Sequence, residues 1–287
     1  MRNPQHWMIV GGLLLIGAPA AHAATTPGSD QFSLSAGADY SSGKYGTDTT
    51  TDIWSVPVTA AYQSDRWTFK LTMPYINVSG PGNVIPGVGK VKNNNPLCRG
   101  VGRAVGGAIH ACGGSSTGGT TTTTSGSASG LGDITASAGY ELFGSADRTF
   151  GLDLTGKVKF GTADENKGLG TGKNDYGLSL DTYKVSGAWT AFGGVGWMKY
   201  GNSQYIQLKN GFNANIGADY KLSPSDSIGA YYYYRERIAD GGAPQSELTG
   251  YWNHKLSDNL RVQAYVLGGF ANGSPDYGAG ASLKYSF

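Results

Sequence analysis

Few residues of this chain could do chemistry, and none is spaced for catalysis. Four histidines occur, and only His110 and His254 lie beyond the first thirty residues. Neither has an obvious serine or carboxylate partner that would complete a nucleophile and a base. Carboxylates alone could act on a substrate, but no spacing of them points to such a reaction. We therefore predict that the protein is not an enzyme.

One loop resembles two kinds of ligand site and fits neither. The segment 161–175 (GTADENKGLGTGKND) is rich in glycine. A phosphate-binding loop would need a glycine where Lys167 stands and a serine or threonine where Asn174 stands. A calcium loop would need its turn glycine at Leu169. A flexible hairpin loop is favoured over a loosely bound calcium ion.

The two cysteines, Cys98 and Cys112, suggest a metal site only at first sight. With His110 they would supply three ligands, but no fourth ligand is evident. We predict no metal ion and no cofactor. Whether the cysteines pair depends on the compartment, which the amino terminus indicates.

The amino terminus is typical of an export signal. Arg2 supplies a positive start, residues 8–16 (MIVGGLLLI) an apolar core, and Ala21-His22-Ala23 a cleavage site. We predict a signal peptide over 1–23 and a mature chain from Ala24. Exported chains meet an oxidising environment, so a disulfide between Cys98 and Cys112 is favoured over two free thiols.

The composition favours an all-β chain without a polyanionic partner. It has 47 glycines, 18 tyrosines and only 15% charged residues, which disfavours helices. The formal net charge is +2, so nucleic acid is not an expected partner. No apolar run after Ile16 approaches the length of about 20 residues that a membrane helix needs.

A period of two in hydrophobicity is the main structural signal. The last eleven residues, YGAGASLKYSF, alternate apolar with small or polar side chains, and Phe287 ends on the apolar parity. Twelve segments share this pattern, which predicts a transmembrane antiparallel up-and-down β-barrel of about 12 strands over 24–287 rather than a β-sandwich. The facing of 189–197 is undecided. The segments are 32–40, 54–62, 67–75, 134–142, 150–160, a strand opening at 176–180, 189–197, 212–220, 228–234, 248–256, 260–270 and 277–287.

The connections support the barrel because they alternate in length. Short turns at 63–66, 144–148, 184–187, 221–226 and 257–259 alternate with longer links, as in barrels with short periplasmic turns and long extracellular loops. Aromatic residues gather at strand ends, where they would form girdles at the two membrane interfaces. We predict an outer-membrane location, with the lipid of that membrane as a partner.

The link 79–130 is unusually long and has a basic charge pattern. It carries Lys90, Lys92, Arg99 and Arg103 and no acidic residue. It is a candidate plug or lid that folds into the lumen against carboxylates such as Asp133, or a loop that faces the phosphates of lipopolysaccharide. A solvated loop is the simpler alternative, above all for its threonine run at 120–124.

The inward parity defines a candidate solute pathway of mixed charge. Strong ion selectivity is not expected from it. Its tyrosines could contact an aromatic solute or could only fill space. The residues assigned to the pathway are Lys70, Asp153, Lys157, Lys159, Asp181, Tyr231, Tyr233, Arg235, Arg237, Arg261 and Lys284.

Several motifs resemble an outer-membrane transporter family associated with the meta-pathway of phenol degradation. They are spread over nearly the whole mature chain, and 92–124 looks like an insertion in the family pattern. The resemblance implies uptake of small hydrophobic or aromatic compounds, and it identifies no binding residues. The motifs are Met73-Pro74-Tyr75, Gly80-Pro81-Gly82, Gly130-Leu131-Gly132-Asp133, Lys157-Val158-Lys159-Phe160 with Thr162-Ala163, the GLGTGK run at 168–173 before Asp175-Tyr176, and Ser274-Pro275-Asp276-Tyr277-Gly278.

Two functional hypotheses remain open at the level of sequence. The first is a channel for passive uptake of small, hydrophobic or aromatic solutes. The alternative is a non-conducting surface or adhesin-like barrel that displays the long loop. Phe287 resembles the terminal aromatic signal of related outer-membrane proteins, which implies the barrel-insertion machinery as a partner.

Overall fold

The computed structural model describes residues 30–95 and 125–287. The expected signal peptide and both cysteines, Cys98 and Cys112, lie outside these ranges, as does His110. In the described ranges no helix is long and apolar enough to cross a membrane.

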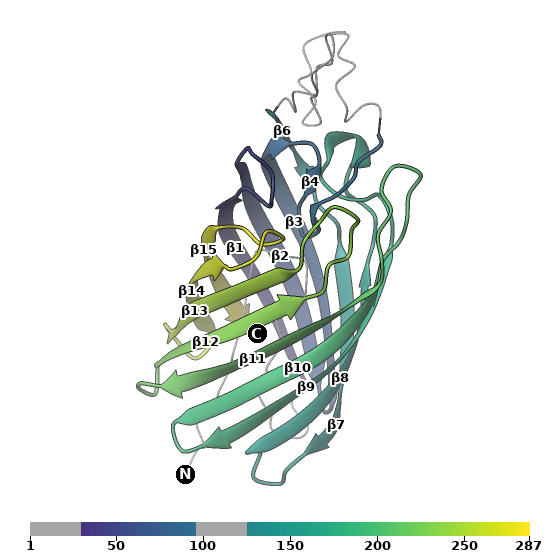
Figure 1. Cartoon of the computed structure of the whole chain (residues 1–287). Coiled ribbons are helices and arrows are strands. Elements are labelled where there is room, and N and C mark those ends of the chain that lie inside the picture. Colours follow the sequence, from purple (N-terminus) through teal and green to yellow (C-terminus); the bar gives the residue numbers. More distant parts are fainter. Residues whose placement is uncertain (1–29, 96–124) are drawn as a thin grey trace, which may run out of the picture.

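The strands form one closed antiparallel barrel (Figure 1). Thirteen strands belong to the main sheet, and β6 and β7 both pair with β3, one after the other, so the wall has twelve positions. Pairing of β2 with both β1 and β3 closes the ring. This confirms the predicted twelve-stranded barrel. The wall strands are β1 Gln31–Gly43, β2 Thr51–Ser64, β3 Trp67–Pro81, β6 Ser125–Leu131, β7 Thr135–Gly144, β8 Phe150–Lys159, β9 Asp175–Ser186, β10 Trp189–Lys199, β11 Gly211–Lys221, β12 Asp226–Arg235, β13 Gln245–Lys255, β14 Leu260–Gly269 and β15 Tyr277–Ser286.

Two small elements lie at the end with the long loops. A hairpin of β4 (Val84–Ile85) and β5 (Gly89–Lys90) follows β3, and a short 3-10 helix, η1 (Glu165–Lys167), lies between β8 and β9. The opposite end has the short turns. We call the two ends extracellular and periplasmic, as their loop lengths indicate.

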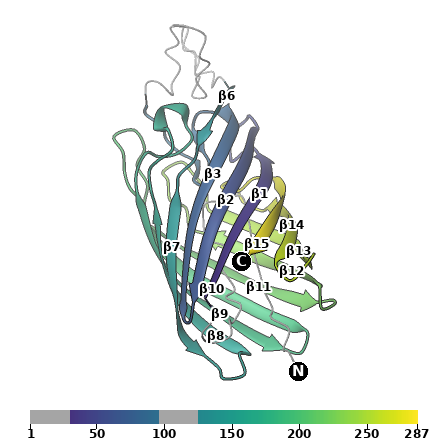
Figure 2. The same ribbon diagram turned by 180° about the vertical axis from the view of Figure 1, so that it is seen from behind.

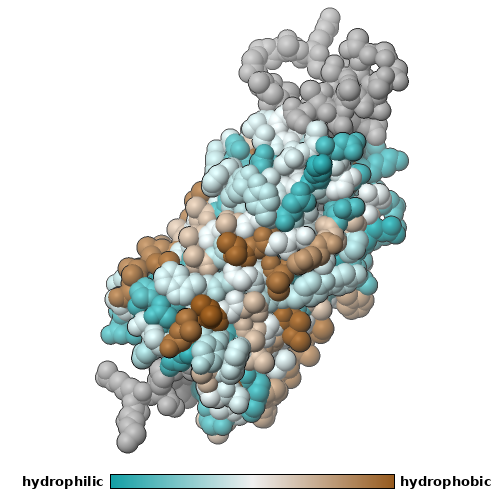
Figure 3. Space-filling view, turned by 60° about the vertical axis from the view of Figure 1, so that its left-hand side comes forward, coloured by the Kyte–Doolittle hydropathy of each residue, from teal (hydrophilic) through white to brown (hydrophobic). Residues whose placement is uncertain are grey.

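The outer wall is apolar, as the alternation of the sequence predicts. Ile216, Val195 and Leu178 are 68%, 60% and 54% exposed, and hydrophobic residues gather across the middle of the wall in Figure 3. Soluble monomers rarely expose so large an apolar surface, whereas transmembrane barrels present one to the lipid. The facing of β10 is now defined: Trp189 points outward, and Phe192 and Met198 are buried inside.

The fourth wall position is interrupted. β6 pairs with the extracellular half of β3 and β7 with its periplasmic half, as Figure 2 shows. Between them Gly132 donates to the carbonyl of Pro74 (2.8 Å), and Asp133 is buried inside. A Cβ at Gly132 would lie 2.9 Å from Cγ of Pro74. Glycine is therefore required where the chain turns Asp133 inward.

The barrel closes between its first and last strands. β1 and β15 pair from Ser33–Ser286 to Ser42–Tyr277. The N–H of Phe287 donates to the carbonyl of Phe32 (2.9 Å), and their ring centroids lie 5.4 Å apart. The last strand therefore closes the barrel against the first.

Candidate functional site

The periplasmic part of the lumen carries charges of both signs on different walls. Asp153 of β8 and Asp181 of β9 are direct cross-strand partners. Arg261 of β14 and Lys284 of β15 are partners in the same way. Counted around the ring, β8 and β14 lie six positions apart, on opposite sides of the twelve. Lys70 of β3 interacts electrostatically with both aspartates and with Lys284, so the five groups share one region.

Hydrogen bonds of amide side chains link three neighbouring strands inside the lumen. Sequence reasoning did not identify these residues. Nε2 of Gln263 donates to Oδ1 of Asn253 (2.8 Å), and Nδ2 of Asn253 donates to the hydroxyl of Ser227 (3.3 Å). They lie on β14, β13 and β12. These hydrogen bonds connect the strands without adding charge to the lumen.

A layer of aromatic side chains lines the middle of the lumen. The ring centroid of Tyr231 lies 6.5 Å from that of Phe192 and 6.3 Å from that of Tyr251, within the range of favourable aromatic pairs. Sequence reasoning placed Tyr231 and Tyr233 here. The layer, defined as the buried cluster, comprises Tyr183, Phe192, Tyr231, Tyr233, Tyr251, Tyr265 and Leu267.

Glycines determine how these rings lie. Four tyrosines of the layer each stand directly opposite a glycine on a neighbouring strand: Tyr183–Gly151, Tyr231–Gly217, Tyr251–Gly229 and Tyr265–Gly280. A Cβ at Gly280 would lie 2.5 Å from Cε1 of the Tyr265 ring, and one at Gly217 would lie 2.5 Å from Cβ of Tyr231. With no Cβ opposite, the tyrosine side chain can lie close against the wall. The lumen therefore gains an aromatic surface at little cost in width.

Buried carboxylates hold two of these rings in place. The hydroxyl of Tyr265 donates to Oδ1 of Asp39 on β1 (2.8 Å). Tyr251 is an electrostatic neighbour of Asp219 on β11. Both aspartates are buried, and a charged acceptor makes the stronger class of hydrogen bond. The carboxylate of Asp39 thus fixes the position of the Tyr265 ring.

The β4–β5 hairpin lies inside the extracellular end of the barrel. Ile85 and Val91 pack with inward-facing Met198 and with Tyr200, Ile206 and Ile238. On the other side Val84 packs with Ile53, Ile76 and Leu169. The hairpin therefore links the two apolar clusters of this end. Its position in Figure 1 is within the upper rim, beneath β6.

One arginine ties the hairpin to the wall. Arg235, at the extracellular end of β12, is 1% exposed. Its Nη1 donates to the carbonyl of Gly87 and its Nη2 to that of Val88, both at 2.8 Å. Arg237, which shares its parity in the sequence, lies beyond the end of β12 with an exposed side chain. The structure therefore separates these two residues.

Lys159 anchors the loop that follows β8. Its Nζ lies 2.6 Å from Oδ2 of Asp133 and 3.0 Å from Oδ2 of Asp175, and all three side chains are buried. It also donates to the hydroxyl of Thr171 at 3.2 Å. Asp133 further accepts the N–H of Ala163 (2.9 Å). Lys157 interacts electrostatically with Asp175 and Lys159, so it lies beside this group.

The glycine-rich loop 161–175 is ordered by these bonds. Asp164 caps η1 by accepting the N–H of Asn166 at 2.9 Å, and Gly168 ends the turn with φ 69°. The carboxylate of Asp164 therefore binds the backbone of its own loop. Among the described residues, no group of three or more His, Cys, Asp or Glu side chains could hold a metal ion.

The structure gives partners for two residues that the sequence left open or without one. Of the basic residues of the long link, which could meet inward carboxylates such as Asp133 or lipopolysaccharide, Lys90 donates from Nζ to the carbonyl of Gly46 (2.7 Å), and Asp133 is paired with Lys159. His254 was taken to have no carboxylate partner, yet its Nδ1 lies 2.8 Å from Oδ1 of Asp226. The hairpin between β12 and β13 brings these two together, which their distance in sequence concealed.

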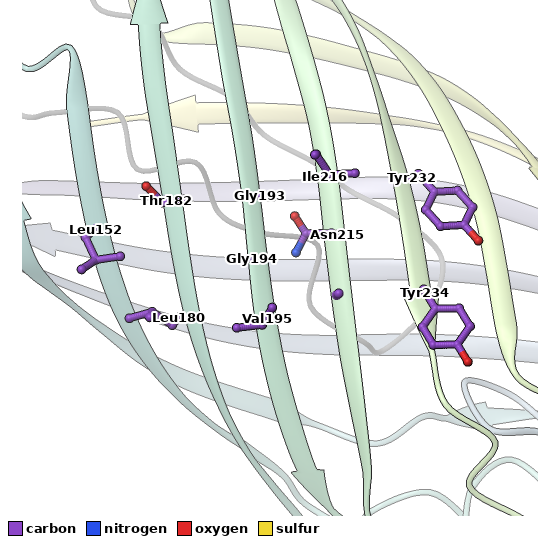
Figure 4. A pocket seen from close by; sticks show the side chains of 11 residues that line it. Leu152, Leu180, Thr182, Gly193, Gly194, Val195, Asn215, Ile216, Tyr232 and Tyr234 are labelled. Carbon is purple, nitrogen blue, oxygen red and sulfur yellow. The ribbon is translucent and has the colours of Figure 1, made fainter.

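A separate hollow of about 390 Å³ lies on the outer wall over β8–β12 (Figure 4). Outward-facing Leu180, Val195 and Ile216 line it, and its floor is at Gly193 and Gly194. The ladders of β10 with β9 and β11 run past these glycines in unbroken register. The hollow therefore lies on the lipid-facing side of the wall.

A closed barrel with an apolar outer belt and polar side chains inside belongs to the class of outer-membrane β-barrels. Comparison with family models then assigns the chain more narrowly. A family described as "Putative MetA-pathway of phenol degradation" matches residues 104–287, which is more than half of the chain. The protein belongs to this family, which confirms the resemblance seen in its motifs.

One solved structure has the same fold over its whole length. The COG4313 outer membrane channel from Pseudomonas putida F1 is 15% identical with a TM-score of 0.62, over 95% of this chain and 100% of that one. The KdgM porin (9% identity, TM-score 0.48, 88% and 99% coverage) and the CymD monoaromatic hydrocarbon channel (11%, 0.41, 91% and 88%) are more distant. No curated protein sequence matches the chain.

Proposed function

We propose that the barrel is a passive channel for small solutes with an aromatic or apolar part. The observation that carries this proposal is the layer of inward-facing tyrosines, four of which stand opposite glycines on neighbouring strands. A tyrosine opposite a glycine takes up less of the lumen than one opposite a larger side chain, so an aromatic surface fits inside a barrel of this size. The name of the Pseudomonas putida relative, an outer membrane channel, agrees with this role.

The charged walls near the periplasmic end fit a general channel rather than a selective ion pore. Asp153 and Asp181 on one side and Arg261 and Lys284 on the other contribute opposite charges. With Lys70 the region holds three cations and two carboxylates, so a solute crossing it meets both signs of charge, which suits amphipathic and zwitterionic molecules.

A channel that prefers aromatic solutes should distinguish phenylalanine from leucine. These two amino acids have the same charges and similar size, and neither crosses lipid readily. In swelling assays with proteoliposomes we expect phenylalanine to enter faster, and Tyr183→Leu with Tyr231→Leu to reduce the ratio of rates roughly threefold, since aromatic pairs contribute about 0.5–1.5 kcal/mol each. Tyr176→Leu, on the exposed outer face, is the matched control.

A non-conducting surface barrel is the second candidate, because the hairpin occupies the extracellular end. In that case neither amino acid enters, and deletion of the hairpin residues 83–92 leaves the vesicles impermeable. Entry of either solute would exclude it.

Four finer expectations stand as proposals. We infer cleavage of the leader after Ala23, a disulfide between Cys98 and Cys112, contact of the basic long loop with lipopolysaccharide, and recognition of Phe287 by the insertion machinery. The described contacts of Phe287 with Phe32 support the last one, because this residue completes the seam that insertion must close.

A further inference from the structure

Arg235 is bound in an unusual way for a buried cation. Its side chain is 1% exposed, and its two hydrogen bonds in the described chain go to the carbonyls of Gly87 and Val88. Both acceptors are neutral. A buried guanidinium is best stabilised by a carboxylate, whose negative charge compensates its own and whose two oxygens accept its N–H groups as a pair. The two bonds of Arg235 to the hairpin supply no such compensating charge.

Polar atoms around Arg235 are left unsatisfied while the hairpin is in place. Among the described residues, Nε of Arg235, the hydroxyls of Tyr200 and Tyr233, and Oε1 of Gln245 are buried without a well-formed hydrogen bond. Tyr200 and Tyr233 are both electrostatic neighbours of the guanidinium. Burial raises the pKa of Tyr200. The unsatisfied Nε and the two tyrosine hydroxyls therefore lie in the same buried region.

The carboxylate already present nearby does not saturate these donors. Glu247 is an electrostatic neighbour of Arg235, but it accepts a hydrogen bond from Nε2 of Gln245 at 3.3 Å. The hydrogen bonds of the guanidinium go instead to the hairpin. A second carboxylate, brought by a solute, would find both a cation and free donors.

The surroundings of Arg235 indicate what such a solute would carry. Tyr233 and Tyr231 lie on the inner face of β12, two and four residues before Arg235, and belong to the aromatic layer. A molecule with a carboxylate at one end and an aromatic ring at the other matches a guanidinium beside aromatic rings. Small aromatic carboxylates are the class that this arrangement fits.

We propose that Arg235, with the hydroxyls of Tyr200 and Tyr233, forms a binding site for the carboxylate of a small aromatic acid, and that occupying it releases the β4–β5 hairpin. The inference rests on the proposed channel function and names a solute class for it. The carboxylate takes the place of the carbonyls of Gly87 and Val88. Because it binds only where those bonds are broken, it shifts the population toward the released hairpin.

Hydrogen exchange of the full-length barrel in detergent tests this without requiring transport. Benzoate is the probe, and benzamide, with the same ring but no charge, and sodium chloride at equal ionic strength are the controls. The reporters are the amides of Val88 and Val91, which donate to Ile85 and Asn83 within the hairpin. The amide of Phe287, at the seam, reports on the barrel itself.

We expect benzoate alone to speed exchange at Val88 and Val91 in a saturable way and to leave Phe287 unchanged. Arg235→Gln should exchange faster without ligand and show no further response, while the exposed Arg237→Gln should behave as the native chain. If Arg235→Gln does not fold, Tyr200→Phe with Tyr233→Phe serves instead. Loss of two bonds to a charged group should raise the half-saturating benzoate concentration roughly tenfold or more.

An unchanged hairpin in the native protein at saturating benzoate would overturn the proposal. An equal response in Arg235→Gln, or an equal response to benzamide, would also overturn it, since the effect would then arise elsewhere. The channel function is judged separately: barrels that admit phenylalanine but whose hairpin ignores benzoate keep the function and lose this site.

Discussion

At the residue scale, the lumen is shaped by pairs of a tyrosine and a glycine. A tyrosine on one strand and a glycine directly opposite on the next recur four times around the wall. In Tyr265 the ring is also held by Asp39. The glycine is as much a part of the aromatic surface as the tyrosine, because it gives the ring its place.

Gly280→Ala tests this pairing. Its Cβ would lie 2.5 Å from Cε1 of Tyr265 and would also meet Oδ1 of Asp39, so the ring must move off the wall. We expect a loss of about 1–3 kcal/mol in the free energy of unfolding, the usual range for an overpacked site, measured by urea titration in lipid vesicles. Gly250→Ala is the control, since nothing lies within 4 Å of its Cβ. Equal stability of both variants would contradict the pairing.

The parity of the sequence identified Tyr231 and Tyr233 as inward but could not show what lies opposite them. Cross-strand neighbours depend on register, and a shift by one residue exchanges every partner. For the same reason the sequence did not predict the pairing of Lys159 with Asp133 and Asp175, since the three residues come from separate parts of the chain. Alternation gives the facing of a side chain, whereas the register gives its partner.

At the element scale, the extracellular end is built from two anchored segments, the β4–β5 hairpin and the loop after β8. Both rest on inward cations at strand ends, Arg235 and Lys159. The link 79–130 was expected to contain a plug, a surface loop or a solvated coil. Of its described part, the β4–β5 hairpin packs inside the barrel, whereas residues 125–130 belong to the wall strand β6. Two-residue strands carry no periodic signal, so the hairpin itself could not be foreseen.

Lys159→Met tests the anchoring of the second segment. It leaves Asp133 and Asp175 buried without their shared cation, and we expect a loss of about 3–5 kcal/mol in unfolding free energy. The added changes Asp133→Asn and Asp175→Asn should restore part of that loss. Lys209→Met, which breaks the exposed pair with Asp240, should cost less than about 1 kcal/mol. A small effect for both lysines would mean that the buried group does not anchor the loop.

At the scale of the whole molecule, a twelve-position barrel encloses three zones in order: opposed charges toward the periplasmic end, an aromatic middle, and a tethered hairpin at the extracellular end. Strand number and loop asymmetry followed from the period-two pattern because lipid on one side and polar groups on the other impose it along every strand. How the hairpin fills the extracellular end could not be predicted from that pattern, since it depends on how the clusters around Ile85 and Val84 pack.

The central claim is that this lumen is a continuous path, and the current through single purified barrels in a planar lipid bilayer tests it most directly. We expect discrete, uniform current steps for the native chain, and larger steps when residues 83–92 are deleted, because the hairpin then no longer narrows the extracellular end. Folded barrels that insert but pass no current, both with and without the hairpin, would contradict the account.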